Sequence, residues 1–492
     1  MPDTSISSRP FVESVGLSGD PLVNGLLYGV RYSTDANGAV DISFSIPGAS
    51  STFATSFNLG YGASDSEVNS GWHPVTASQA DVLRQALDDI ERYTNASFTE
   101  VSDTGTLAGT IRMAWTDYVD DETLAWAYYP TSAPVAGDIW LISGTLSESD
   151  AYFETTIYHE LGHALGLKHP HEAEGKFPVL AAGYDGNDYT VMSYNVSARY
   201  SEALWTDLEP DGYMYLDIMA LQALYGTDTV TTGRADTYNF DLSERHLTTI
   251  WDAGGIDTLS VTNGPDDVTI SLIPGTWSDI GTVVTYSSRS TNYRENETVF
   301  IAPDTWIEKA SGASGNDTLI GNKQANTLLG NAGDDTLRGG HSGDTLSGGD
   351  GDDRILGQQG FDRMYGDAGD DFLSGIWGAD LLDGGAGDDR LIGGPGRDTI
   401  IGGTGHDTMT GGSEADTYIF ADNSGGDRIT DFDTSRDILD FSGLTGGFAS
   451  EAAARAAMTQ DSWGLVIDLG GGDWVRLVGL TSADANDVIV VV

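Results

Sequence analysis

The sequence predicts an α+β domain followed by an all-β domain built as a parallel β-roll. Three observations support this order. Apolar residues recur at helical spacing before about residue 230. After that point, short strand-like runs alternate with turn residues. From Gly312 to Ile419 the chain then divides into twelve nine-residue units without an insertion. We expect a flexible leader or pro-segment over residues 1–20, a first domain over 21–230 and a second domain over 231–492.

The first domain begins with mixed α/β sequence. Apolar spacing from Gln79 to Tyr93 predicts a helix. Strands are expected at Ile111–Ala114 and at Asp138–Ile142, which is rich in β-forming residues. A last helix, Tyr215–Tyr225, ends at Gly226, a residue that commonly follows helices.

A further helix is expected from Asp150 to Leu165, with Ser149 or Asp150 as its cap. Its apolar side chains recur every four residues and define one core face. His159 and His163 lie one turn apart on a different face, so both imidazoles point the same way.

The residues after this helix complete a candidate metal site. Gly166 can adopt a left-handed conformation, end the helix and turn the chain back, so that His169 supplies a third nitrogen. Three nitrogens plus water form the open, tetrahedral kind of zinc site that supports catalysis. Glu160 would face the metal-bound water and act as general base, removing its proton for attack on a peptide carbonyl. His171 is treated as a bystander.

The second domain is dominated by its repeat. Every unit opens with Gly, carries Asp or Asn at its sixth place and mostly an aliphatic residue at its eighth. Stacked units would bury the aliphatic side chains as a ladder and place Gly-Asp turns outside, where oxygens form cages for calcium. The second unit departs from the pattern, with Asn326 at its sixth place. The expected calcium-binding residues within the repeats are Asp317, Asp335, Asp344, Asp353, Asp362, Asp371, Asp380, Asp389, Asp398, Asp407 and Asp416.

Composition narrows the class of protein. The formal net charge of −52 argues against nucleic acid or an anionic membrane as partner, whereas it suits many bound divalent cations. An acidic halophile surface is the alternative, but the acidic residues are unevenly distributed. The chain has no cysteine, which excludes disulfides and thiolate chemistry. No run is long and apolar enough for a membrane span, and Met1–Asp20 does not resemble a Sec signal.

Further motifs identify a family. Met192-Ser-Tyr194 follows the extended zinc motif, and the sequence resembles the metzincin clan of zinc endopeptidases, in particular its serralysin branch. Pro170, Leu224-Tyr-Gly and the segment Trp251–Thr258 also fit that branch.

The resemblance implies a metzincin-like catalytic domain with one catalytic zinc. In such a domain Met192 lies beneath the metal. Tyr194 can ligate the metal at rest and swing away to hydrogen-bond the oxyanion. An edge strand at Gly137–Ser143 would bind an extended peptide. Calcium is further expected at Asp252 and Asp257.

The same resemblance implies that the protein is bacterial and is exported by type I machinery, without an N-terminal signal peptide, through an uncleaved C-terminal signal. The acidic and apolar end of the chain, Asp487–Val492, is similar to such signals. Several structural calcium ions would then trigger folding outside the cell. The sequence thus predicts a secreted, monomeric zinc endopeptidase acting on proteins or peptides. A calcium-dependent adhesin with a vestigial protease fold, and a polysaccharide-active zinc hydrolase, are the alternatives.

Overall fold

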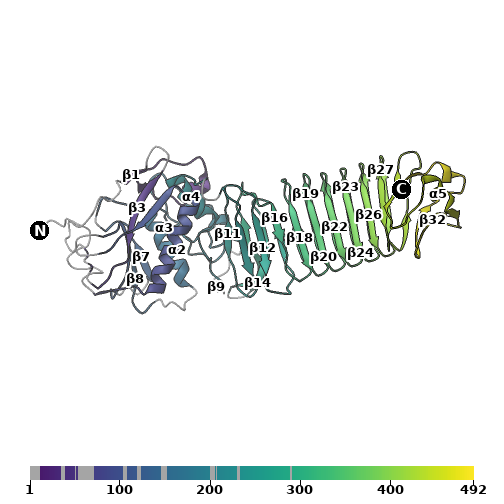
Figure 1. The fold of residues 1–492 in the computed structure, drawn as a ribbon. Coiled ribbons are helices and arrows are strands. Elements are labelled where there is room, and N and C mark those ends of the chain that lie inside the picture. The colour runs from purple at the N-terminus through teal and green to yellow at the C-terminus, as the bar shows by residue number, and fades with distance from the viewer. Residues whose placement is uncertain are drawn as a thin grey trace. The chain divides into compact units, whose positions relative to one another are not determined.

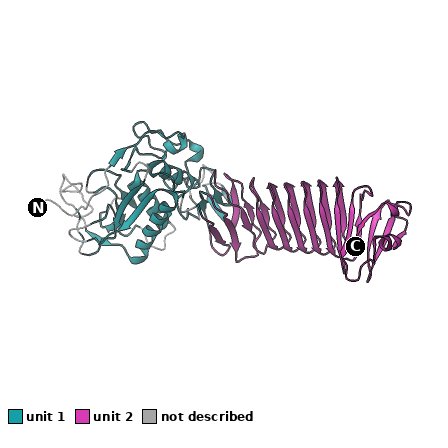
Figure 2. Cartoon of the chain, turned by 45° about the horizontal axis from the view of Figure 1, so that its top comes forward, with its two compact units in different colours: residues 1–233, 246–253, 283–302 teal, residues 234–245, 254–282, 303–492 magenta. Residues whose placement is uncertain are grey.

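The computed structural model describes residues 12–492, except 35–38, 50, 52, 54–70, 104–107, 119–122, 134, 146–151, 200–204, 207, 230–232 and 289–290. The chain divides into two compact units (Figure 2). Unit 1 comprises residues 1–233, 246–253 and 283–302, and unit 2 comprises residues 234–245, 254–282 and 303–492. The division therefore differs from a single boundary at residue 230, because two later segments pack with unit 1.

Unit 1 contains a 6-stranded sheet in the order β5-β3-β6-β8-β7, with β4 paired to β6. The strands are β3 (Val40–Ser45), β4 (Trp72–Pro74), β5 (Ala96–Glu100), β6 (Ile111–Thr116), β7 (Ala125–Ala127) and β8 (Asp138–Ile142). Strands β6 and β8 are parallel and buried at every position, whereas β7 pairs antiparallel with β8. The expectation that Gly137–Ser143 forms the edge is therefore wrong, since β7 covers β8.

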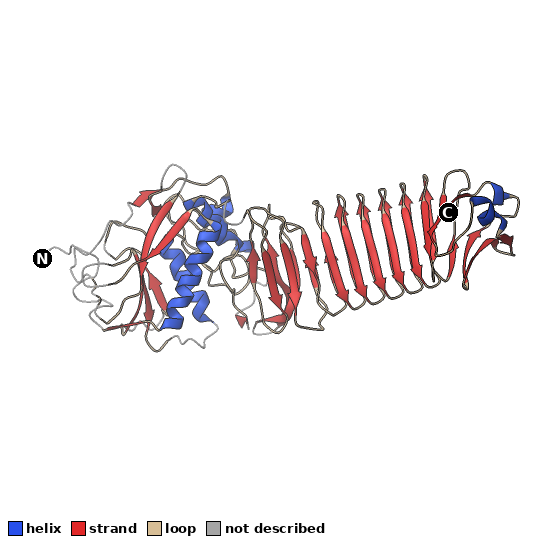
Figure 3. Ribbon diagram, viewed as in Figure 1, coloured by secondary structure: helices blue, strands red, loops and turns tan. Residues whose placement is uncertain are grey.

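Two helices, α2 (Ala77–Tyr93) and α3 (Tyr152–Leu165), pack against this sheet (Figure 3). Helix α4 (Tyr215–Tyr225) packs against α2 and against the short helix α1 (Pro21–Asn24). Helix α2 begins two residues before its predicted start, because Thr76 and Gln79 form a reciprocal capping box. Helix α3 packs against α2, β7 and β8, and its side chains are almost all buried. The cap predicted for α3 at Ser149 or Asp150 lies outside the described residues.

The N-terminal part of unit 1 differs from the expected flexible leader. Strand β1 (Val12–Ser14) pairs antiparallel with β2 (Val30–Tyr32). The Asp20 carboxylate caps α1 by accepting a 2.7 Å hydrogen bond from the Leu22 amide. Residues 12–20 are therefore part of the fold, and residues 1–11 lie outside the described part of the chain.

Two later segments complete unit 1. Strand β11 (Thr248–Ile250) pairs in parallel with the end of β15 (Asn292–Ile301). Strand β9 (Trp205–Thr206) pairs with the last residues of β14 (Trp277–Ser287). These pairings join residues far apart in sequence, which local patterns do not reveal.

Unit 2 is a parallel β-roll in which alternate repeat units feed two sheets (Figure 1). One sheet contains β10 (Thr237–Asp241), β12 (Thr258–Thr262), β16 (Lys309–Ser311), β18 (Thr327–Ala332), β20 (Thr345–Asp350), β22 (Arg363–Ala368), β24 (Leu381–Ala386), β26 (Thr399–Thr404), β28 (Thr417–Ala421), β30 (Ile438–Gly443) and β34 (Ile489–Val491). The other contains β13 (Thr269–Ser271), β17 (Thr318–Ile320), β19 (Thr336–His341), β21 (Arg354–Gln359), β23 (Phe372–Trp377), β25 (Arg390–Pro395), β27 (Thr408–Ser413), β29 (Gly426–Ile429), β33 (Asp473–Val478), β32 (Gly464–Gly470) and β31 (Met458–Gln460).

The register of the roll follows the repeat. Residues 18 apart pair in parallel, as Thr336 does with Arg354. The eighth-place side chains, such as Leu337 and Ile355, are fully buried. Each nine-residue unit thus adds one inward apolar side chain, so that each 18-residue turn adds two, one in each sheet. These side chains stabilise the stack by burying apolar surface. The predicted fold class, α+β followed by a parallel β-roll, is confirmed. A short helix, α5 (Glu451–Ala456), follows the repeats. Within the described residues, no helix has the length and apolar character needed to cross a membrane.

Candidate metal centre, adjoining pocket and repeat turns

The end of α3 is built to return the chain toward its own histidines. Gly166 has φ +110° and donates its amide to the His163 carbonyl, while the Leu167 amide bonds to Gly162. A Cβ at Gly166 would lie 2.4 Å from the Val30 carbonyl oxygen, so a side chain does not fit there. The tight turn carries His169 back beside the last turns of the helix.

The structure brings His159, His163 and His169 together. The His169 Nε2 lies 3.2 Å from the His159 Nε2 and 3.0 Å from the His163 Nε2. The Nδ1 atoms of His159 and His163 each lie 2.8 Å from a carbonyl oxygen, of Val191 and Leu167 respectively. A carbonyl only accepts hydrogen bonds, so both Nδ1 atoms carry protons and both Nε2 atoms carry lone pairs.

Converging lone pairs repel each other unless a cation lies between them. Burial lowers the pKa of His159 to about 4, the pKa of His163 well below its usual value and the pKa of His169 below its usual value. The three imidazoles are therefore neutral near pH 7, as metal ligands must be. The donor set fits a zinc ion. His171 lies beside the group, with its ring centroid 5.3 Å from that of His169.

Glu160 lies on α3 beside the histidines and is 6% exposed. The Ala127 amide of β7 hydrogen-bonds to its carboxyl, while its Oε2 is buried and without a hydrogen-bond partner. Burial raises the pKa of Glu160 to about 8. A buried carboxyl with one free oxygen next to a metal site is suited to exchanging a proton with water.

Met192 and Tyr194 both lie near the histidines, Met192 buried and Tyr194 exposed. Met192 is fully buried, and a Cβ at Gly162 would lie 2.6 Å from its Sδ, so the turn packs directly under α3. Tyr194 is 67% exposed, and its hydroxyl lies 2.7 Å from the His169 Nε2.

The buried carboxylate of Asp217, on α4, fixes the Met192 turn. It accepts hydrogen bonds from the Thr190 hydroxyl at 2.5 Å and the Val191 amide at 2.8 Å. Burial raises the pKa of Asp217 to about 7. Because the Val191 carbonyl in turn orients His159, Asp217 of α4 helps to position a histidine of the candidate metal site.

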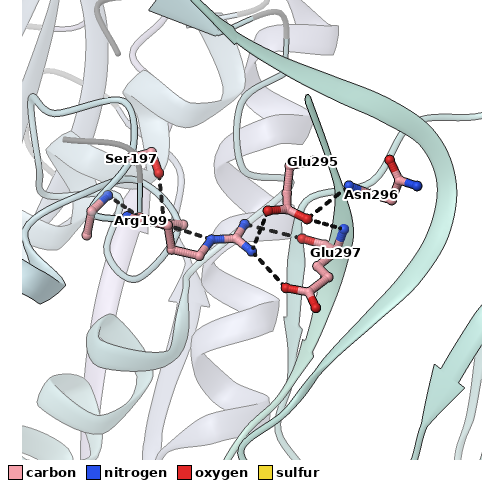
Figure 4. A network of polar contacts seen from close by, with 7 residues as sticks. Ser197, Arg199, Glu295, Asn296 and Glu297 are labelled. Carbon is pink, nitrogen blue, oxygen red and sulfur yellow. Dashed lines mark hydrogen bonds and ion pairs between the residues drawn. The ribbon is translucent and has the colours of Figure 1, made fainter. Parts of the chain in front are cut away.

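The loop after Tyr194 is held within unit 1 by Arg199 (Figure 4). Its guanidinium donates to Asp188 at 3.0 Å and to the Glu297 carbonyl at 3.2 Å, and lies 3.6 Å from the Glu295 carboxylate. Asp188 also accepts from the Ser197 hydroxyl. This network joins the loop to β15.

Lys168, which precedes the third histidine, is fully buried. Its ammonium group donates to backbone carbonyls of four residues: Gly25 at 2.6 Å, Glu172 at 2.5 Å, Pro178 at 3.1 Å and His169 at 3.3 Å. The group ties the segment carrying His169 to the start of the fold.

A pocket of about 330 Å³ adjoins the histidines. It contains Glu160 together with two polar residues that no motif identified, Asn187 and Glu209. The remaining lining residues are Thr123, Leu124, Ala125, Tyr152, Thr155, Thr156, His159, Val191, Ser193, Tyr194 and Val196.

In unit 2, the sixth-place aspartates form regular ladders. From Asp335 to Asp416, each Oδ1 accepts the amide of the sixth-place residue 18 positions earlier, at 2.6–3.0 Å. The other carboxylate oxygen, Oδ2, is buried without a hydrogen-bond partner in Asp335, Asp344, Asp353, Asp362, Asp371, Asp380, Asp389, Asp398, Asp407 and Asp416.

The space beside each of these oxygens is bordered by a glycine, and beside Asp371 also by a backbone carbonyl oxygen of a neighbouring repeat. A Cβ added at Gly366 would lie 2.2 Å from the Asp371 Oδ2 and 2.3 Å from the Gly384 carbonyl oxygen. Burial raises the pKa of Asp371 to about 7, because its charge has no partner. Oxygens from neighbouring turns therefore converge on a gap that suits calcium.

Other predicted calcium residues differ from this arrangement. The Asp317 Oδ2 accepts a 2.7 Å hydrogen bond from the Ala313 amide, so that oxygen is satisfied. Asp252 is buried, and the Oδ2 of the buried Asp257 has no hydrogen-bond partner. Sequence reasoning missed Asp427, whose Oδ1 continues the ladder by accepting the Asp407 amide at 3.0 Å. The spacing there changes from 18 to 20, which hides it from a nine-residue pattern.

Comparisons with known proteins agree with this architecture. Residues 215–466 match the family described as Peptidase M10 serralysin C terminal. A metallopeptidase AprA from Pseudomonas marginalis is 29% identical over 326 residues, covering 59% of this chain and 62% of the relative. Serralysin B from Dickeya chrysanthemi is 33% identical over 281 residues, covering 50% of this chain and 53% of the relative. A serralysin from Proteus mirabilis is 29% identical over 294 residues, covering 50% and 55% respectively. The chain thus spans somewhat more than half the length of these curated relatives.

Proposed function

Because the chain belongs to the serralysin family of M10 peptidases, we propose that it is a secreted, zinc-dependent endopeptidase that hydrolyses internal peptide bonds of extracellular proteins. The observation that carries this proposal is the convergence of three Nε2 atoms beside the unpartnered Oε2 of Glu160. His159, His163 and His169 would hold one zinc ion. That ion supplies Lewis acidity toward a peptide carbonyl and a water molecule.

Glu160 is the general base in this mechanism. Its free oxygen accepts a proton from the attacking water, and the buried carboxyl holds that proton. The same oxygen then delivers the proton to the leaving amine, so the carboxylate is regenerated. The Ala127 amide holds the other side of the carboxyl and keeps it oriented.

Tyr194 donates a hydrogen bond to the oxyanion of the tetrahedral intermediate. Its hydroxyl rests on His169 in this structure, and its exposed side chain has room to move. Met192 gives the histidines a rigid apolar base beneath Gly162. The substrate strand would add to β7, whose Ala127 amide already contacts Glu160, and not to the covered β8.

In unit 2, several structural calcium ions would occupy the gaps beside the sixth-place aspartates. Ten of the predicted residues, from Asp335 to Asp416, carry an unpartnered oxygen that a calcium ion would satisfy. The repeats would repel one another without calcium and close once it is bound, so we propose that calcium drives folding after export.

We further propose that the protein is bacterial, exported by type I machinery and monomeric outside the cell, with no nucleic-acid partner. In the folded chain Ile489–Val491 is strand β34 of the roll, paired with β30. The export machinery would therefore have to bind this segment before the roll folds. The net charge of −52 supports both the calcium requirement and the exclusion of nucleic acid.

Cleavage of casein in the presence of calcium tests the proposed activity. Wild type should cut, a zinc-selective chelator should stop cleavage and added zinc should restore it. Glu160→Gln should bind zinc normally and lose at least about 100-fold in kcat. If zinc-loaded wild type cuts no protein, the peptidase proposal fails. The result would then favour a calcium-dependent adhesin or a polysaccharide-active zinc hydrolase.

A further inference from the structure

Two buried oxygens in the pocket beside the histidines lack hydrogen-bond partners. They are the Oε1 of Glu209 and the Oδ1 of Asn187. Glu209 is only 7% exposed. A buried acceptor without a donor costs free energy, so a protein keeps one where a ligand supplies the missing donor.

The two residues are arranged as a pair of acceptors. The Asn187 Nδ2 donates to the Glu209 Oε2 at 3.0 Å, which fixes the amide with its oxygen unpaired. The Asn187 backbone amide bonds to the Asn195 carbonyl at 2.9 Å, so the loop carrying this side chain is itself anchored. Burial raises the pKa of Glu209 to about 7, as expected for a carboxyl with no cation beside it.

Three hydroxyls among the described lining residues are already used elsewhere. The Thr155 hydroxyl donates to the Pro210 carbonyl, the Thr156 hydroxyl to the Tyr152 carbonyl and the Ser193 hydroxyl to Asp185. Neither lysine nor arginine is among the described lining residues. Within the described part of the chain, the Glu209 Oε1 and the Asn187 Oδ1 therefore accept no hydrogen bond from the other lining residues.

We propose that this pocket selects a basic side chain, arginine above all, on a substrate residue next to the scissile bond. A guanidinium offers several N–H donors in one plane and a positive charge, so it can bond Glu209 and Asn187 together. Its methylene stem can pack on Leu124, Val191 and Val196. A volume of about 330 Å³ accommodates such a side chain. The inference rests on the proposed peptidase function and adds a substrate preference to it.

Matched peptides test the preference. They differ only at one residue beside the scissile bond, which is arginine, citrulline or norleucine. Wild type should cleave the arginine peptide with kcat/KM roughly 10- to 100-fold above the norleucine peptide. The citrulline peptide, which keeps donors but lacks charge, should lie between them.

Glu209→Gln should bring the arginine-to-norleucine ratio to within about threefold of unity, because Gln keeps the shape and removes the charge. Glu154→Gln is the matched control, since Glu154 is an exposed carboxylate of α3 outside this pocket, and it should keep the wild-type ratio. Zinc content and thermal unfolding establish that each variant is folded.

The outcomes separate this inference from the proposed function. If wild type cleaves the three peptides equally, the preference is overturned while the peptidase function stands. If wild type cleaves none of them and no protein, the peptidase function fails. In that case the affinities of the arginine and norleucine peptides for zinc-loaded Glu160→Gln still test the preference of the pocket. Equal affinities overturn it.

Discussion

At the scale of single residues, the reactive groups differ in how firmly they are held. His163 and Glu160 are each 6% exposed and lie within the packed part of unit 1. Tyr194 is 67% exposed and its ring lies against the rings of His159 and His169. An exposed side chain can move without disturbing the core, which suits the movement proposed for Tyr194.

Tyr194→Phe removes the hydroxyl and keeps the ring packing. We expect kcat to fall about 10²- to 10³-fold, the loss typical of a missing oxyanion donor, with KM and zinc content little changed. Steady-state kinetics on a peptide substrate, with zinc measured on the same samples, checks this. Unchanged kcat would remove Tyr194 from the mechanism, whereas loss of zinc would make it a structural ligand.

At the scale of elements, the site depends on how α3 is continued. The buried Lys168 ammonium donates hydrogen bonds to the carbonyls of Gly25, Glu172 and Pro178. These bonds fix the turn that carries His169. An ammonium group thus occupies a cage of oxygens similar to those that bind metal cations elsewhere. The next residue along the chain is His169, the third of the proposed zinc ligands.

Lys168→Met keeps the length of the side chain and removes its donors, which leaves buried carbonyls unsatisfied. We expect the free energy of unfolding to fall by about 3 kcal/mol and zinc to dissociate faster than from wild type. Thermal unfolding and zinc transfer to a chromophoric chelator measure the two effects. Lys176→Met, at an exposed lysine of the same loop, should change neither. Equal zinc loss from both variants would contradict a positioning role for Lys168.

Elements with long periodic patterns could be predicted from sequence, and features set by distant pairing could not. Helix α2 begins within two residues of its predicted start, and the nine-residue repeat predicted the roll. Strand β7 has three residues and is defined by its pairing with β8, so the edge of the sheet was misassigned. Glu209 escaped notice because it belongs to no motif, and only its burial next to Asn187 reveals it.

At the scale of the whole molecule, charge links folding to cations. The chain carries a formal net charge of −52, and the roll buries a row of aspartates with unpartnered oxygens. Burial raises the pKa of Asp335, Asp344 and Asp371 from 3.8 to about 7. Each such carboxyl is stable in the folded roll as a neutral acid or as a calcium ligand.

The sign of the pH dependence follows from those shifts. Between pH 3.8 and about 7 the folded roll binds protons that the unfolded chain has released. Without calcium, stability should therefore fall as pH rises through this window and be lowest above pH 7. Calcium should replace the protons, so its stabilising effect should be larger at pH 8 than at pH 5.5. Hydrogen exchange of residues 327–419, with calcium or a chelator, measures this. A larger calcium effect at the lower pH would contradict it.

The central claim is that three histidines, two of them oriented by backbone carbonyls, hold one zinc ion beside Glu160. Zinc analysis combined with X-ray absorption at the zinc edge tests this most directly. We predict one zinc per chain, bound by three imidazole nitrogens with oxygen completing the shell, and loss of that signal in His163→Ala. An oxygen-only shell, or full zinc occupancy in His163→Ala, would contradict the account.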